Sequence, residues 1–343
     1  MGTVSLGVVS EISTQILIKN GIPAKDAAIV ADTILDAHRK GRHTHGIGRL
    51  PIYVRRVKEN LMSAETIMKP VSDTPLVTVY DAQNGFGQVA AYRGMTQCIE
   101  KAALHGVGVV ANKEANSFGT AGYYGELAAK RGMISIVMGN ASPAIAPTGG
   151  SRAILGTNPI CFSFPGTANN KPIILDMACS VVARGKIRLA AKNGEKIPFG
   201  WALDSNGNPT DDPNAAIKGT LNAIGGHKGF GLALVADILA GLLSGSAFAG
   251  DAKALDTPSG PSRCGHFFAV INPEFFISRE EYEERIDYLI ERIKACGEPG
   301  GVFMPGEIEY LHETDHSETV ELSAGVIDDV NRLAEDSGIE LRL

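Results

Sequence analysis

Residues 41–50 read GRHTHGIGRL and bring together side chains that transfer protons and bind anions. Histidine titrates near neutral pH, so His43 or His45 could act as an acid or a base. Arginine binds a carboxylate through two parallel hydrogen bonds, which suits Arg49 as a substrate ligand. His38, His43 and His45 could instead hold a metal ion, although no carboxylate at a familiar spacing completes such a site. A solvent-exposed polar turn is the third interpretation, and spacing alone leaves all three open.

A glycine-rich stretch farther along the chain is a candidate anion site. GGHKGFGLAL begins at residue 225 and leads directly into a predicted helix. The first amides of a helix are unpaired and its dipole favours negative charge, so a phosphate or carboxylate could bind there beside Lys228. A glycine-rich turn with a solvated lysine is the alternative interpretation.

A second stretch, NGFGQVAA, has the spacing of a Rossmann dinucleotide fingerprint at Gly85, Gly87 and Ala90. However, residues 81–84 separate it from the preceding strand. The acidic residue expected about 20 positions later should end a second strand, whereas the region of Glu100 is helical. We therefore interpret this stretch as a turn that opens a helix.

The elements that position these residues follow from hydrophobic periodicity. Apolar side chains at helical spacing predict a first helix that stops at Gly21, a second that follows Pro23 and ends before the 41–50 segment, and a third that starts no earlier than about 48–50 because of Pro51. Strands and helices alternate over residues 76–140, which is typical of α/β layering. Further strands are expected at 159–166, 172–178 and 266–273, a buried helix at 229–245, and charged amphipathic helices after 278.

These elements predict an α/β fold in which a helical lobe, formed by both ends of the chain, flanks a central α/β unit. We expect an N-terminal helical lobe over residues 1–72, a central α/β domain over 73–277, and a C-terminal helical segment over 278–343 that packs back on the first lobe. A chain of 343 residues is long enough for two domains and a deep cleft.

Composition excludes several classes of protein. The apolar share of 44% and the charged share of 20% are typical of a soluble globular protein. The net charge of −6 is spread along the chain, so nucleic acid is not an expected partner. No stretch reaches the roughly 20 apolar residues of a membrane span, because Asp237 interrupts the most apolar one. Five scattered cysteines without a CxxC pair, and an N-terminus without signal-peptide features, fit a reducing cytoplasm.

Seven blocks taken in order resemble the malate/L-lactate dehydrogenase family, which also includes ureidoglycolate, sulfolactate and diketogulonate dehydrogenases and cyclic imino-acid reductases. The resemblance covers nearly the whole chain, and the joint occurrence is far more specific than any single block. The blocks are THGIGRLPIY (44–53), NGFGQVAA (84–91), ANSFGTAGYY (115–124), GNASPAIAPTGGSRAILGTNPICFSFP (139–165), ILDMA (174–178), GGHKGFGLALVADILAGLLSG (225–245) and GHFFAVINP (265–273).

The resemblance implies a homodimeric oxidoreductase that uses NAD or NADP on a non-Rossmann α/β fold. The resemblance also implies that this enzyme acts on small 2-hydroxy or 2-oxo acids of the malate, lactate or sulfolactate type. It implies that His45 is the acid/base, that Thr44 orients it, and that Arg49 binds the substrate carboxylate, with Tyr53 and Ser117 in the same substrate site. The cofactor contacts that it implies are Asn140, Thr157, Asp176, Met177, Ala178, His227, Lys228, Pro305 and Gly306.

Two departures from the family pattern bear on the substrate. Many members have a histidine where this chain has Ser117, and some pair the catalytic histidine with an acidic residue that we do not find in residues 186–201. A cyclic imino-acid reductase is therefore one alternative, because protonated imines need less help from a general acid. A nucleotide-binding dimer without catalysis is the other.

Overall fold

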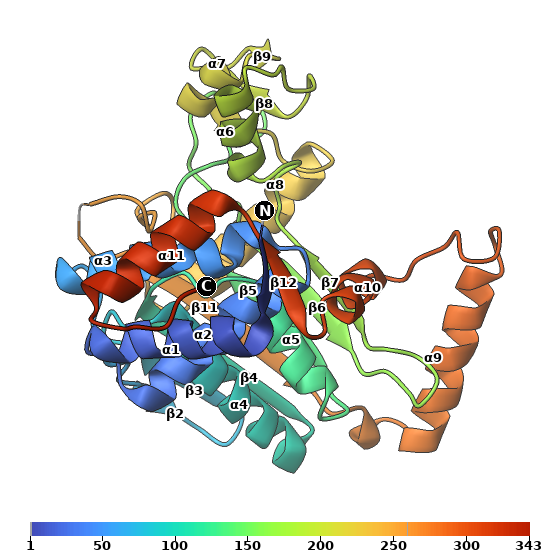
Figure 1. Cartoon of the computed structure of the whole chain (residues 1–343). Helices are drawn as coiled ribbons and strands as arrows, with labels where there is room; N and C mark the ends of the chain where they lie inside the picture. Colours follow the sequence, from blue (N-terminus) through green and yellow to red (C-terminus); the bar gives the residue numbers. More distant parts are fainter. Residues whose placement is uncertain (1, 259) are drawn as a thin grey trace.

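The computed structural model describes residues 2–258 and 260–343 (Figure 1). The chain begins with a short strand and three helices. Helix α1 buries an apolar stripe against α2, and α3 begins at Leu50 with Pro51 in its first turn, where a missing amide hydrogen costs nothing. The first elements are β1 (Gly2–Ser5), α1 (Leu6–Lys19), α2 (Ala24–Arg39) and α3 (Leu50–Lys58).

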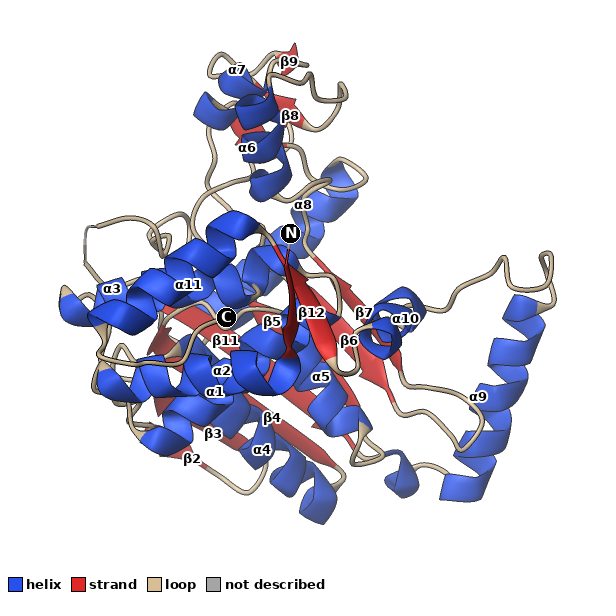
Figure 2. Ribbon diagram, viewed as in Figure 1, coloured by secondary structure: helices blue, strands red, loops and turns tan. Residues whose placement is uncertain are grey.

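A mixed seven-stranded sheet forms the centre of the molecule (Figure 2). Its strand order is β2-β3-β4-β11-β5-β6-β7, and only the β3–β4 pair is parallel. A Rossmann sheet is parallel throughout its nucleotide-binding half, so this sheet confirms the expected non-Rossmann α/β fold. The strands are β2 (Lys69–Asp73), β3 (Val77–Asp81), β4 (Val107–Ala115), β5 (Ile134–Gly139), β6 (Ile160–Phe164), β7 (Ile173–Met177) and β11 (Cys264–Ile271).

Helices cover both faces of this sheet. Successive strand residues point to opposite faces, so Val137 joins one buried cluster and Met138 the other. The first face packs against α4 (Gly87–His105) and α5 (Ala121–Ala129). Helix α4 begins at Gly87, which confirms that NGFGQVAA is a turn that opens a helix.

The two ends of the chain form one compact unit. Strand β1 pairs antiparallel with β12 (Thr319–Leu322), and α11 (Ala324–Asp336) lies against the first helices (Figure 1). Their apolar residues share one core, in which Ile12, Leu50 and Val320 are fully buried.

A small lobe projects from the end of the molecule that carries α8, and the periodicity of the sequence does not predict it (Figure 1). Its strands have two residues each, which is too short for an alternating pattern. The lobe consists of α6 (Arg184–Asn193), β8 (Ala202–Leu203), β9 (Pro209–Thr210), α7 (Pro213–Lys218) and β10 (Thr220–Leu221).

The apolar stretch at 229–245 forms α8 (His227–Ala236) and a π-helical turn, η3 (Asp237–Leu242). Ala233 and Ala236 pack into the core on the second sheet face. The opposite side is uncovered, and the expected buried helix is therefore wrong for the single chain. A sequence that is apolar on every side of a helix does not show whether each side is covered by the same chain or by another molecule. The exposed residues are Leu232, Leu234, Val235, Ile238, Leu242 and Leu243, at 40–59% exposure.

The remaining helices lie on the far side of β7. Helix α9 (Arg279–Lys294) follows the turn η4 (Pro273–Phe275) and extends away from the body, whereas α10 (Glu307–Asp315) lies beside β7 (Figure 1). Of the C-terminal elements, β12 and α11 share the core of the N-terminal helices, and α10 reaches α2 through a 3.0 Å ion pair between Glu313 and Arg39. Within residues 2–258 and 260–343, no helix has both the length and the apolarity to cross a bilayer.

Candidate active site

The residues of GRHTHGIGRL form two successive 3-10 turns between α2 and α3. The turns are η1 (His43–His45) and η2 (Ile47–Arg49). Gly46 joins them, and a Cβ there would stand 2.7 Å from Nδ1 of His38, so only glycine fits. The close approach fixes the path of the chain and turns His45 toward a cleft.

Hydrogen bonds link the three polar residues of this turn. The Thr44 hydroxyl lies 3.1 Å from Nδ1 of His45. The Nε of Arg49 donates to the Thr44 carbonyl at 2.7 Å. Because only Nε of Arg49 is used in this way, its two terminal nitrogens remain available for a carboxylate.

These residues line a cleft of about 950 Å³. Its walls come from segments that are distant in sequence: the His45 turn, the end of β4, the loop before β6, the end of β7, the start of α6, and residues 252–257. Of the residues predicted for the site, the cleft brings together Thr44, His45, Arg49, Ser117, Thr157 and Ala178.

Burial, together with nearby positive charges, keeps the imidazole of His45 neutral. Burial, followed by the nearby cations Arg49 and Arg42, lowers the pKa of His45 from 6.5 to about 4. No carboxylate among the described residues contributes to this pKa or bonds to the ring. At neutral pH the imidazole of His45 is therefore unprotonated and has a free nitrogen that can accept a proton.

The other histidines of the cluster point elsewhere. The rings of His38 and His43 lie 4.5 Å apart, and Nε2 of His38 is 3.1 Å from the carbonyl of Glu321. Across the part of the chain that the structure describes, no three histidine, cysteine or acidic residues are grouped as metal ligands would be.

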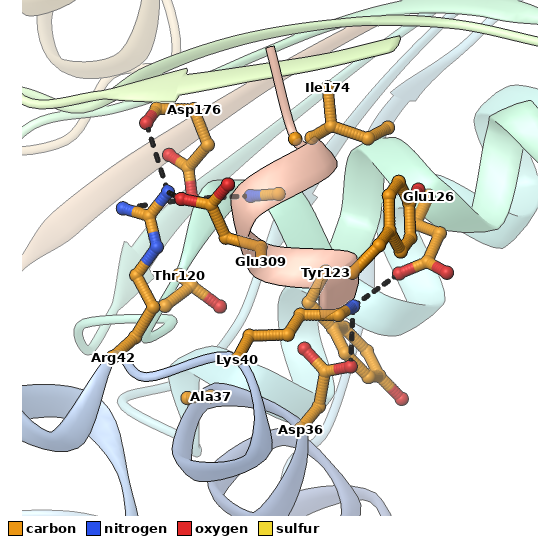
Figure 3. Close-up of a pocket in the computed structure, with 13 residues that line it drawn as sticks. Asp36, Ala37, Lys40, Arg42, Thr120, Tyr123, Glu126, Ile174, Asp176 and Glu309 are labelled. Atoms are coloured by element: carbon orange, nitrogen blue, oxygen red, sulfur yellow. Dashed lines mark hydrogen bonds and ion pairs between the residues drawn. The ribbon is translucent and has the colours of Figure 1, made fainter. Parts of the chain in front are cut away.

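A second, narrow pocket of about 30 Å³ lies behind the turn (Figure 3). Arg42 reaches across it, donating to the main-chain carbonyl of Asp176 at 3.3 Å and to Glu309 at 3.0 Å. Burial raises the pKa of Asp176, which also accepts a 3.0 Å hydrogen bond from the Gly122 amide. Asp176 and Gly306 line this pocket rather than the cleft. It holds no more than a water molecule while the Arg42–Glu309 ion pair is closed.

Two predicted site residues are buried away from the cleft. Asn140 uses its amide to join elements: its nitrogen donates to the Ala247 carbonyl at 2.6 Å and its oxygen accepts from the Gly265 amide at 2.8 Å. Tyr53 is 3% exposed and packs against Phe86 with ring centroids 6.0 Å apart. Both side chains support the walls of the site.

The last four predicted residues line neither cavity. His227 and Lys228 are exposed in the first turn of α8, where no side chain caps the free amides. Met177 lies in β7 opposite Ile160. The Pro305 carbonyl accepts a 2.9 Å hydrogen bond from the Ile174 amide, which ties the segment before α10 to β7.

Sequence reasoning missed several residues around the site. Arg42 belongs to the first quoted segment, and its position in the same turn as His45 was the available signal. Arg184, Gly185 and residues 252–257 reach the cleft through tertiary folding, and no local pattern marks them. Gly185 lies beside the turn, because a Cβ on Gly185 would stand 3.2 Å from Thr44 Cγ2.

Known proteins share this architecture over their full length. The family model for malate/L-lactate dehydrogenase matches residues 4–331. The L-sulfolactate dehydrogenase of Methanocaldococcus jannaschii is 40% identical over 330 residues, covering 95% of this chain and 94% of that protein. The malate/(S)-sulfolactate dehydrogenase of Methanothermus fervidus is 39% identical over 322 residues, covering 94% of each.

The structural comparison agrees. The solved structure of the Methanocaldococcus jannaschii sulfolactate dehydrogenase superimposes with a TM-score of 0.93 at 37% identity, covering 99% of this chain and 98% of that one. Fold and sequence together define a dehydrogenase-type α/β protein with a non-Rossmann sheet. The chain belongs to the malate/L-lactate dehydrogenase family.

Proposed function

We propose that the cleft at His45 interconverts a small 2-hydroxy acid and its 2-oxo acid, with His45 as acid/base and Arg49 as carboxylate ligand. The main support for this proposal is that both side chains line one cleft and that each forms a hydrogen bond with Thr44. The chain is an NAD(P)-dependent oxidoreductase of 2-hydroxy acids, as its family membership and its dehydrogenase relatives indicate.

The geometry suits the chemistry of this reaction. Removing a hydride from a 2-hydroxy acid requires a base for the hydroxyl proton, and neutral His45 can accept it. In the reverse direction, protonated His45 donates to the carbonyl oxygen, where negative charge develops. Two hydrogen bonds from Arg49 fix the substrate carboxylate and therefore the face of the carbonyl that reacts. Ser117 adds a hydroxyl to the same wall.

The residues present fit a nicotinamide cofactor, which supplies the hydride when bound. A cleft of about 950 Å³ has far more room than a small hydroxy acid needs. Thr157 and Ala178 line it and are proposed cofactor contacts, as are Met177, Pro305, and Lys228 with His227 at the uncapped start of α8. Asp176 and Gly306 are proposed contacts that require the Arg42–Glu309 ion pair to open.

Asn140 and Tyr53 take a supporting role in this proposal, because their side chains are buried outside the cleft. The two alternatives are not favoured. Two relatives that are 40% and 39% identical over nearly the whole chain are named for their action on sulfolactate and malate, which are hydroxy acids. Ser117 thus modifies the substrate pocket of a hydroxy-acid enzyme.

We also propose that the protein is a homodimer in a reducing cytoplasm. The apolar side of α8 and η3 is exposed in the single chain, and large exposed apolar patches mark protein contacts. This surface supports a dimer in which a second copy of the chain covers it. Five free cysteines, four of them buried, support the compartment. Light scattering should give twice the mass of one chain, and Ile238→Asp should shift the protein toward monomer. A monomeric wild type would contradict the dimer.

The direct test of the function uses purified protein with NADH or NADPH and a panel of 2-oxo acids. Oxidation of the reduced nicotinamide is followed by its absorbance. We expect turnover with at least one 2-oxo acid and its loss in His45→Gln. Binding of cofactor without reduction of any oxo acid would overturn the proposal.

A further inference from the structure

We propose that Arg184 binds a second acid group of the substrate, so that the cleft selects 2-hydroxy diacids, or hydroxy acids with a sulfonate, over monoacids. This inference rests on the proposed function, because it names the substrate class of the same site. Arg184 would then determine specificity, and His45 and Arg49 would serve every substrate.

Arg184 stands close to the reacting end of the cleft. It is the first residue of α6 and lines the cleft with His45 and Arg49. The next residue, Gly185, lies against Thr44, so that a Cβ there would be 3.2 Å from Thr44 Cγ2. The start of α6 therefore abuts the turn that carries the acid/base.

The charges of the cleft are unbalanced in a way that fits two anionic groups. Its cationic side chains are Arg49, Arg184, Arg188 and Lys253, and Asp256 is the single acidic side chain among its described lining residues. Asp256 is already bound to Arg188, with 3.1 Å between Oδ2 and Nη1. A substrate with a single carboxylate would neutralise Arg49 and leave Arg184 without an anionic partner.

Arg184 itself has no hydrogen bond or ion pair within the described part of the chain. Burial, and then the like charge of Arg188, lower the pKa of Arg184, and the charge of Asp256 opposes this shift without reversing it. A cation at the start of a helix opposes the helix dipole, and a like charge four residues later adds repulsion. This placement destabilises the free protein, and an anion bound between Arg184 and the free amides of α6 would remove the cost.

The competing occupant is a phosphate of the cofactor, and the test separates the two. We compare oxaloacetate, a 2-oxo diacid, with pyruvate, the corresponding monoacid, at saturating cofactor. The variants are Arg184→Gln, Arg184→Lys and the matched control Arg188→Gln, which removes a neighbouring arginine that already has a partner. Circular dichroism melting verifies that each variant folds, and cofactor affinity is measured by nicotinamide fluorescence.

The wild type should prefer oxaloacetate. Arg184→Gln should lower kcat/KM for oxaloacetate by about 10- to 100-fold, the usual effect of losing a charged hydrogen bond, and should change pyruvate by less than about 2-fold. Arg184→Lys should retain part of the preference, because it keeps the charge but not the two-pronged contact. Arg188→Gln should leave the ratio of the two substrates close to the wild-type value.

Three results would overturn the inference while the proposed function stands. They are equal use of both substrates by the wild type, an equal loss on both in Arg184→Gln, and a loss confined to cofactor affinity, which would assign Arg184 to a phosphate. If the wild type turns over neither acid, and neither malate nor lactate raises its melting temperature in the presence of cofactor, the proposed function fails as well.

Discussion

The Nε of Arg49 donates a 2.7 Å hydrogen bond to the carbonyl of Thr44, the residue that precedes His45. The proposed carboxylate ligand and the proposed acid/base are therefore parts of one hydrogen-bonded turn. A shift of either residue displaces the other, which couples the position of the substrate to the position of the proton acceptor.

Arg49→Lys should raise KM for the 2-oxo acid at least 10-fold and leave cofactor affinity near the wild-type value. A lysine ammonium cannot hold a carboxylate with two parallel hydrogen bonds and bond to the Thr44 carbonyl at the same time. Steady-state kinetics and cofactor titration check both effects. An unchanged KM would contradict the role of Arg49 as carboxylate ligand.

His45→Gln should lower kcat by about 10²- to 10⁴-fold, the usual contribution of a positioned acid or base. Cofactor affinity should be retained, because glutamine preserves a polar side chain in the same turn. A single-turnover measurement separates the chemical step from product release. Full activity of this variant on a 2-oxo acid would show that another group transfers the proton.

The pH profile of hydroxy-acid oxidation should reflect the lowered pKa of His45. Burial and the neighbouring cations move this pKa to about 4 from 6.5, so the base form persists as the medium is acidified. We expect kcat/KM for oxidation to stay level from about pH 8 to about pH 5. An ordinary histidine would lose activity tenfold per unit below its pKa of 6.5. A decrease in kcat/KM with its midpoint near pH 6.5 would contradict the lowered pKa of His45.

The free energy of unfolding should decrease as the pH decreases, because of His266, whose side chain is buried at 1% exposure. Burial lowers its pKa from 6.5 to about 4, although a hydrogen bond to the Asn116 carbonyl opposes the change. Between these values the unfolded chain binds a proton that the native protein does not. The contribution is thus complete above pH 6.5 and is lost as the pH falls toward 4.

Urea unfolding at about pH 7 and about pH 5 measures this contribution. The wild type should lose about 2 kcal/mol from this residue over that interval, given about 1.4 kcal/mol per unit of pKa shift. His266→Gln should show a smaller loss between the two pH values, whatever its stability at neutral pH. Equal pH dependence in both proteins would exclude His266 as the cause.

Gly87→Ala should destabilise the protein by about 1–3 kcal/mol and reduce activity. A Cβ there would stand 2.0 Å from the carbonyl oxygen of Asn116 and 2.4 Å from that of Ser117, which lines the cleft. Gly325→Ala is the matched control, because nothing lies within 4 Å of its Cβ position in α11. That control should be neutral or gain up to about 1 kcal/mol of stability. Denaturant unfolding and kinetics compare the two, and a tolerated Gly87→Ala would contradict the close packing.

Much of the fold is local enough for the sequence to predict it. Helical periodicity placed α1 and α2, and Pro51 set the start of α3. Strand order was not predictable, because β11 inserts between β4 and β5 from far along the chain. The pairing of β1 with β12 was not predicted either, because the two strands come from opposite ends of the sequence.

The candidate site divides in the same way. His45 and Arg49 stand four positions apart, so their shared turn was visible in the sequence. Arg184 reaches the cleft only through tertiary folding, because it lies far from both residues in the sequence, so no local pattern could reveal that it lines the same cleft. Asn140 was expected to contact the cofactor because it belongs to a family motif. In the structure its side chain instead forms hydrogen bonds with main-chain groups.

The union of the two chain ends has a consequence for protein synthesis. The carbonyl of Glu321 in β12 lies against His38, and α11 packs on the turn that contains Arg49, with Val326 beside Gly48. Both β12 and α11 must therefore have left the ribosome before the His45 turn has its support. A nascent chain that has already folded the earlier strands of its central sheet still lacks these two elements beside the proposed acid/base.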